Sequence, residues 1–145
     1  MGDTMPREEY IGGAAIFPQG TEGKQGMIDP INSRHGGNMF DKQSNNGYKL
    51  TLAGIEQKTL VYGDKTLMVE FRLQTNATLP LHSHPHEQTG YLVKGNIKLT
   101  IGTDVHNVLP GDSWCIPGGV LHCAEIIEDS VAVEVFSPVR QEYLP

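Results

Sequence analysis

Residues 81–95 read LHSHPHEQTGYLVKG and contain three of the six histidines of the chain. Successive side chains of a strand point to opposite faces, so His82 and His84 project to the same side. Gln88 keeps that side if the run stays extended. Because imidazole nitrogen binds zinc, copper, iron and nickel, the spacing predicts that one metal ion contacts all three side chains.

His86 has the same parity as these candidate ligands, but it follows Pro85, which bends the chain. We therefore expect His86 to face solvent or to support the ligands from behind. For this stretch alone, the alternative is a histidine-rich polar loop that binds nothing.

A second motif, GDSWCIPGGVLH at residues 111–122, supplies a fourth candidate ligand, His122. A turn at Pro110-Gly111-Asp112 precedes a short predicted strand, and Pro117-Gly118-Gly119 predicts another turn before His122. A histidine placed after such a turn could return to the first site. In isolation, a histidine among apolar residues more often belongs to the core.

Together the two stretches resemble the paired signature of the cupin superfamily. The first cupin motif is HxH, three or four residues, Glu, six residues and Gly, and it matches His82, His84, Gln88 and Gly95. The second is Gly, five residues, PxG, two residues and His, and it matches Gly111, Pro117, Gly119 and His122. The resemblance covers roughly residues 48–145.

The resemblance implies one divalent transition metal ion, whether zinc, nickel, manganese, iron or copper, held by His82, His84, Gln88 and His122. Gln88 departs from the usual glutamate of the family. A neutral amide leaves the full charge of the ion to polarise a bound carbonyl or water, so we expect a Lewis acid.

Strand patterns dominate from Tyr48 onward. Leu67, Val69, Phe71 and Leu73 alternate with other side chains, as do Ile97, Leu99 and Ile101. Gly63-Asp64 and Gly95-Asn96 predict turns between such runs. The pattern predicts an all-β barrel or jelly roll, which agrees with the cupin double-stranded β-helix and gives a barrel domain over residues 48–145.

Residues 1–47 carry nine glycines and short apolar patches at residues 11–17, 27–31 and 39–40. We interpret them as an extended N-terminal arm. Its patches could pack on the barrel or on a second subunit, and a homodimer is expected because cupins often pair. The alternative is a partly disordered tail.

Composition limits the possible partners. A chain of 145 residues with net charge −6 and scattered Lys and Arg predicts one domain and no nucleic-acid binding. The N-terminus lacks the apolar region of a signal peptide, and no segment has the apolar length to span a bilayer, so we expect no membrane association and a cytoplasmic protein. Cys115 and Cys123 are expected to be buried free thiols.

The chain ends in SVAVEVFSPVRQEYLP, residues 130–145. Alternation places Val131, Val133 and Val135 on one face, and Glu134 and Phe136 on the other. The pattern alone favours the valines as core and Glu134 as a solvated residue.

The same ending resembles small single-domain cupins of the KdgF type, which act in pectin and alginate breakdown and whose last strand reads DxFSPxR, then an acidic residue and an aromatic-Leu pair. The matching positions are Glu134, Phe136, Ser137, Pro138, Arg140, Glu142, Tyr143 and Leu144. The resemblance reverses the expectation from the pattern, because in that family the acidic residue and the arginine face the metal pocket. Glu134 is one methylene longer than the family's Asp.

That family converts cyclic 4,5-unsaturated monouronates to linear keto acids. The resemblance implies that Glu134 moves a proton, Arg140 pairs with the carboxylate of the sugar acid and Phe136 packs beside the ring. The alternative for Arg140 is a surface ion pair with Glu142. Two alternative functions are a cupin dioxygenase or other metal-dependent oxidoreductase, and a non-catalytic protein that binds a sugar or another small ligand.

Overall fold

The computed structural model describes residues 37–145, so the expectations for the arm up to residue 36, including its two apolar patches at 11–17 and 27–31, lie outside these residues. The regular secondary structure of these residues is almost entirely strand, which confirms the all-β fold. The elements are β1 (Lys49–Leu52), β2 (Ile55–Tyr62), β3 (Leu67–Leu73), β4 (Thr78–His82), β5 (Glu87–Ile101), β6 (Asp104–Val108), β7 (Ser113–Ile116), β8 (His122–Ser137) and a 3₁₀ helix, η2 (Gln141–Tyr143).

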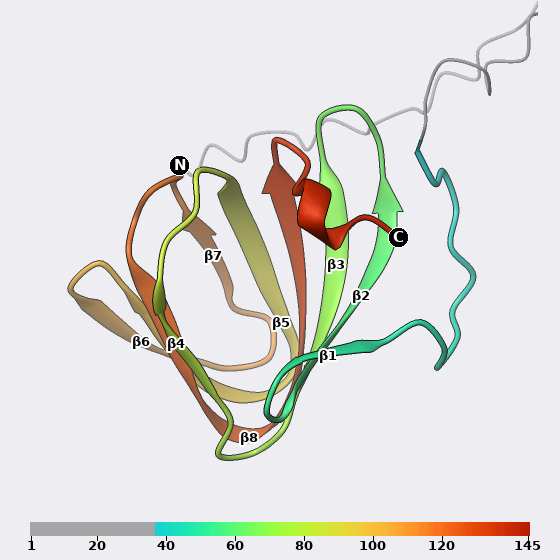
Figure 1. The fold of residues 1–145 in the computed structure, drawn as a ribbon. Coiled ribbons are helices and arrows are strands. Elements are labelled where there is room, and N and C mark those ends of the chain that lie inside the picture. Colours follow the sequence, from blue (N-terminus) through green and yellow to red (C-terminus); the bar gives the residue numbers. More distant parts are fainter. Residues whose placement is uncertain (1–36) are drawn as a thin grey trace, which may run out of the picture.

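Two long antiparallel strands, β5 and β8, organise the fold (Figure 1). The first half of β5 pairs with β7 and its second half with β6, while β8 pairs first with β4 and then with β3. The sheet therefore forms two layers that share the long strands, one ordered β1-β2-β3-β8-β5-β7 and the other β4-β8-β5-β6. This is a jelly roll of the cupin type.

The turn expected at Gly95-Asn96 is wrong, because β5 continues through it with shifted register. Gly95 has φ +98°, and a side chain there would lie 2.1 Å from Ser130 Oγ. Ser130 Oγ instead accepts a hydrogen bond of 3.1 Å from the Asn96 N–H. The positive φ that glycine allows, and that would also suit a turn, here forms a β-bulge. At this bulge the long strands pass from one layer to the other.

Other local expectations hold. Residues 63–66 separate β2 from β3, and Leu67 and Val69 are fully buried, as the alternation predicted. The sequence pattern was wrong for the last strand: Val131, Val133 and Val135 are only partly buried, whereas Phe136 on the opposite face is 1% exposed. Burying an aromatic side chain contributes about 1.5–3 kcal/mol, so the Phe136 face is the interior face.

Two apolar clusters fill the barrel. The larger consists of Ile55, Ala77, Leu92, Ile97, Leu99, Val108, Ala124, Ile126 and Ala132. The smaller lies at the end that carries η2 and consists of Leu67, Val69, Phe136 and Val139. In Figure 1 the strands diverge toward that end, with β4, β6 and β7 on one side and β1, β2 and β3 on the other.

The described part of the expected arm, residues 37–47, has no regular secondary structure and lies along β2. Asp41 pairs with Lys58 at 2.9 Å, and Asn38 donates to the Leu60 carbonyl. Met39 and Phe40 are 70% and 79% exposed, so this patch does not pack into the barrel. The boundary after residue 47 stays a prediction.

Cys115 and Cys123 are free thiols, as expected, but Cys115 is exposed and Cys123 only partly buried, so the expected burial was wrong. Cys115 pairs with Thr89, whose side chain also points outward. Within the described residues, no helix has the length and apolar character required to cross a bilayer.

Candidate metal centre and active-site cavity

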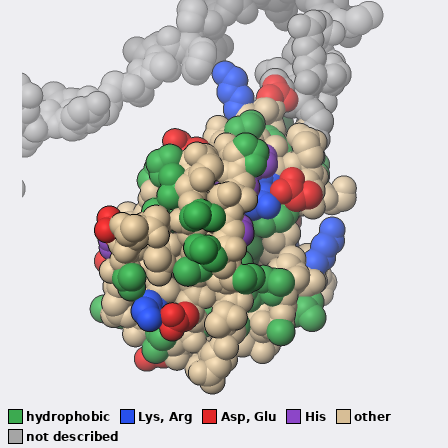
Figure 2. Space-filling model, turned by 60° about the vertical axis from the view of Figure 1, so that its left-hand side comes forward, with side chains coloured by type: hydrophobic (Ala, Val, Ile, Leu, Met, Phe, Trp, Pro, Cys, Tyr) green, Lys and Arg blue, Asp and Glu red, His purple; other side chains and the backbone are tan. Residues whose placement is uncertain are grey.

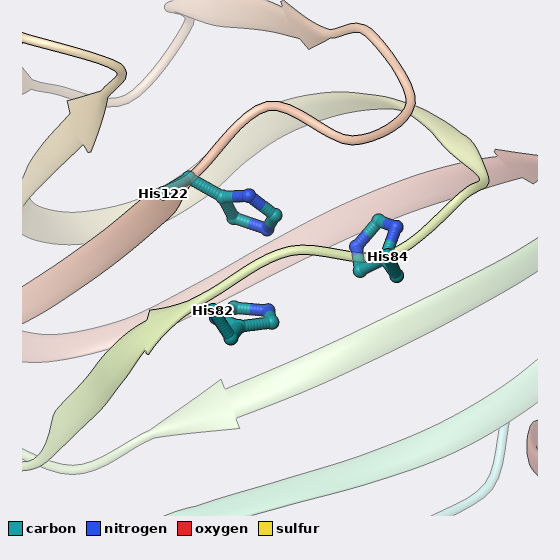
Figure 3. Close-up of side chains that lie close together, drawn as sticks. All are labelled: His82, His84 and His122. Atoms are coloured by element: carbon teal, nitrogen blue, oxygen red, sulfur yellow. The ribbon is translucent and has the colours of Figure 1, made fainter.

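Three of the four predicted ligands converge at the open end of the barrel (Figure 3). His82 is the last residue of β4 and pairs in register with His122, the first residue of β8, while His84 lies in the connection to β5. One ligating nitrogen of each lies within 4.8 Å of those of the other two. The imidazole rings point toward one another, with centroids 4.2 Å apart for His82 and His122 and 5.1 Å apart for His84 and His122.

The glycines of the second motif bring the two motifs together. The Gly119 N–H donates to the His84 carbonyl at 2.7 Å. A side chain at Gly118 would lie 2.3 Å from the Pro85 carbonyl oxygen, so this close approach requires glycine. The turn before β8 is therefore fastened to the segment that carries the first two histidines.

The backbone orients all three imidazoles in the same way. The Nδ1 of His82, His84 and His122 lies 2.9, 3.0 and 2.8 Å from a carbonyl two residues away in the chain. A carbonyl only accepts, so each Nδ1 carries the proton and each Nε2 offers a lone pair. Outer contacts of this kind fix the tautomer of metal-binding histidines. The carbonyl that His84 contacts is the backbone carbonyl of His86, and the expected role of the His86 side chain stays a prediction.

Gln88 completes the ligand group. Its Nε2 donates to Glu134 Oε1 at 2.7 Å, which turns the amide oxygen toward His84 Nε2 at 3.0 Å. The Gln88 amide oxygen and His84 Nε2 are at hydrogen-bond distance, but both present a lone pair and neither carries a proton. A cation between them resolves this conflict, and amide oxygen is a suitable ligand. The strand does not stay extended, since residues 85–86 bend, yet Gln88 reaches the histidines.

His122 gives an independent indication of a cation. Its Nε2 is buried and has no hydrogen-bond partner within residues 37–145. Burial lowers the pKa of His122, and burial followed by the Arg140 charge lowers that of His84, so both rings are neutral at pH 7. Neutral imidazoles with free Nε2 lone pairs are the form that binds a transition metal. The residues therefore fit a single divalent ion.

Glu134 lies next to this group on the interior face of β8, partly buried. Burial raises its pKa to about 7, opposed by the Gln88 hydrogen bond, the Trp114 indole and the Arg140 charge. The indole N–H of Trp114 is buried and has no hydrogen-bond partner within residues 37–145. Glu134 is thus inside the cavity, as the resemblance implied.

Arg140 follows β8 and lines the same cavity, with its side chain 13% exposed. Its guanidinium carbon lies 5.2 Å from the centre of the Phe136 ring and 4.0 Å from that of Tyr143. Nε and Nη2 both bond to Glu142 Oε1 at 2.8 Å. The ion pair of Arg140 with Glu142 that the sequence suggested is therefore present. It lies at the cavity and uses one edge of the guanidinium. The other edge is directed away from Glu142.

The cavity has a volume of about 280 Å³ and is bordered by both apolar clusters. It combines an apolar interior with a polar group made of Gln88, Glu134, Arg140, His82 and His122. On the face drawn in Figure 2, histidine side chains emerge beside a basic and an acidic side chain. Such a combination of apolar walls and few polar groups is typical of a small-molecule site.

Trp114, Tyr143 and Gln57 line the cavity and were not assigned a role from sequence. Trp114 lies inside the second motif, and Tyr143 inside the matched C-terminal ending, so both were adjacent to residues that carried a signal. Gln57 on β2 is 7% exposed and had no such signal.

The comparisons with known proteins agree with this geometry. Residues 69–138 match the family described as Cupin domain, a stretch that contains all four ligand candidates and Glu134. Residues 69–138 thus match a cupin domain and contain a histidine cluster able to hold a metal ion. No curated protein matches the chain in sequence.

Among solved structures, the chain resembles KdgF from Halomonas sp. with 26% identity and a TM-score of 0.70, over 74% of this chain and 99% of that one. An RmlC-like cupin from Shewanella frigidimarina NCIMB 400 gives 21% identity and a TM-score of 0.70, over 74% and 96% of the two chains. Oxalate decarboxylase from Bacillus subtilis gives 22% identity and a TM-score of 0.58, over 63% of this chain and 27% of that one. The last two support the fold alone.

Proposed function

We propose that this protein is a metal-dependent enzyme that converts 4,5-unsaturated monouronates to their linear keto form. The observation that carries the proposal is that Glu134 and Arg140 line one cavity with His82 and His122, two members of the histidine cluster. The likeness to KdgF, which extends over 99% of that chain, supports the same assignment. We infer that the enzyme works on a free sugar acid in the cytoplasm.

The reaction is an isomerisation. Opening of the cyclic hemiacetal moves the proton of the C1 hydroxyl to the ring oxygen, which becomes an enol hydroxyl on C5. The enol then loses that proton while C4 gains one, which leaves a ketone at C5. No oxidant or reductant is consumed, so the protein must only bind, orient and move protons.

Glu134 is the proposed proton carrier. Its Oε1 accepts from Gln88, so the carboxyl is fixed beside the ligand group rather than free to rotate. In this position it can give a proton to C4 and take one from the enol oxygen. A divalent ion held by His82, His84, His122 and Gln88 would supply Lewis acidity toward substrate oxygens.

Arg140 is the proposed binding group for the substrate carboxylate. Glu142 uses the Nε and Nη2 edge, so a carboxylate would approach the edge formed by Nη1 and Nη2. Phe136 and Tyr143 pack against the guanidinium and limit its movement. The apolar interior excludes water from the other side of the substrate.

The test is turnover of unsaturated galacturonate and its alginate-derived counterpart. Turnover is measured as the loss of the ultraviolet absorbance of the conjugated double bond. We expect the metal-loaded protein to be much faster than the spontaneous reaction, with the linear keto acid as product by NMR and no oxygen consumed. Rates equal to the spontaneous reaction on both substrates would refute the proposal. Oxygen uptake with formation of another product would favour the metal-dependent oxidoreductase over the proposed function.

A further inference from the structure

A row of residues crosses the inner layer beside the metal-ligand group. In register, Val69 of β3 pairs with Glu134 of β8, Glu134 with Gly90 of β5, and Gly90 with Trp114 of β7. Residues that are paired across strands project to the same face of a sheet. Trp114 and Glu134 therefore face the same interior, two strands apart, with only glycine between them.

Gly90 makes room for the indole. A side-chain carbon at this position would lie 2.1 to 2.4 Å from three atoms of the Trp114 ring, Cε2, Cζ2 and Nε1. Rigid ring atoms at such distances cannot be accommodated, so the indole lies in the space that any other residue would fill. Gly90 does not have a positive φ, which leaves this close approach as the reason for glycine.

The edge of the ring that enters this space carries the N–H. Trp114 Nε1 is buried, and among the described residues it has no hydrogen-bond partner of regular geometry. A buried donor without a partner costs about 1–3 kcal/mol, so the arrangement has to be offset by another contact. Across Gly90, the next side chain in register is that of Glu134, which lines the same cavity and whose pKa the indole lowers.

We propose that Trp114 is a positioning residue whose indole N–H, passing over Gly90, holds the Glu134 carboxylate as a second donor beside Gln88. Gln88 binds Oε1 at 2.7 Å, and the indole restrains the carboxyl from across β5. The carboxyl is thereby kept in one orientation beside the ligand group. The consequence for turnover rests on the proposed function, whereas the contact itself does not.

The decisive experiment uses the fact that Trp114 is the only tryptophan of the chain. A protein labelled with ¹⁵N-tryptophan gives a single indole N–H resonance. We expect this resonance to move upfield in the proton dimension in Glu134→Gln, because a neutral amide accepts more weakly than a carboxylate. The matched control is Glu125→Gln, an exposed position on the same strand that pairs with Lys98, and it should leave the resonance in place.

Kinetics of Trp114→Phe separate positioning from packing. The variant keeps an aromatic ring and removes the N–H. We expect kcat to fall roughly 10- to 100-fold, as for lost outer contacts of a site, with KM and metal content unchanged. Loss of packing alone would lower thermal stability and leave kcat of the folded protein as in the parent.

The two readouts distinguish failure of this inference from failure of the proposed function. Identical indole resonances in the parent and Glu134→Gln would overturn the contact, whatever the substrate. A kcat of Trp114→Phe equal to that of the parent would overturn the positioning role. If the parent does not act on uronates, the resonance still decides whether the indole holds Glu134.

Discussion

At the scale of single residues, the chemistry depends most on Glu134. Glu134→Gln removes the ionisable carboxyl group but keeps the shape of the side chain and an oxygen that can accept from Gln88 Nε2. We expect uronate turnover to fall roughly 10²–10⁴-fold, the usual contribution of a positioned acid or base, with metal content unchanged. Parallel assays of Glu125→Gln provide the control, and turnover by Glu134→Gln at the rate of the parent would exclude the catalytic role.

The pKa of Glu134 predicts how pH affects the metal-free protein. The folded pKa of about 7 exceeds the ordinary value of 4.5, so the stabilising contribution of the neutral carboxyl is complete below pH 4.5 and is lost as pH rises to about 7. Thermal unfolding of chelator-treated protein should show the parent losing stability across this window relative to Glu134→Gln. The other ionisable groups are the same in both proteins and cancel in this comparison. Parallel curves would mean that Glu134 has an ordinary pKa.

Gln88→Glu tests the neutral ligand. The variant would place a second carboxylate about where Gln88 Nε2 now lies, 2.7 Å from Glu134 Oε1. Two carboxylates at such a distance share a proton or repel, so the metal-free variant should be less stable than the parent. A divalent ion should bind at least as tightly to the variant and turnover should slow, because ligand charge reduces Lewis acidity. Melting temperatures with and without zinc measure the first effects, and unchanged turnover would show that ligand charge is unimportant.

At the scale of elements, the segment after β8 decides how an anion binds. One edge of the Arg140 guanidinium already binds Glu142, so a ligand carboxylate must bind the second edge. Arg140→Lys cannot hold two carboxylates in fixed geometry, and we expect kcat/KM for uronates to fall roughly tenfold or more, mainly through KM. Metal content should not change. Unaltered KM in this variant would place the substrate carboxylate elsewhere.

Local sequence signals predicted the elements that depend on local geometry. The spacing of His82 and His84, the glycine turn before His122 and the alternation in β3 all depend on contacts between near neighbours in the chain. The bulge at Gly95 was mistaken for a turn because glycine favours both, and only the pairing of β5 with β8 distinguishes them.

The contribution of Trp114 could not be predicted for a related reason. Its approach to Glu134 depends on register across three strands and on the absence of a side chain at Gly90. The alternation of Val131 and its neighbours indicated the wrong interior face, because both faces of that strand carry apolar residues. The family resemblance supplied the orientation that the pattern lacked.

At the scale of the whole molecule, the candidate metal centre joins segments that are distant in the chain. His82 ends β4, Gln88 lies on β5 and His122 begins β8, so an ion bound there would cross-link both layers of the barrel. A ligand that binds only the folded state at 100 times its Kd stabilises by about 2.7 kcal/mol. The expected homodimer stays a prediction that analytical ultracentrifugation can test.

The most direct test of the metal centre is the metal content per chain, measured by inductively coupled plasma mass spectrometry on dialysed protein. We predict one divalent transition metal ion per chain in the parent and a large loss in His122→Ala, because this variant removes a cluster nitrogen, Nε2, that is buried and has no partner within residues 37–145. His106→Ala, an exposed histidine on β6, is the control and should keep the metal. Equal metal content in His122→Ala and the parent, or no metal in the parent after loading with zinc, nickel, manganese, iron or copper, would contradict the centre.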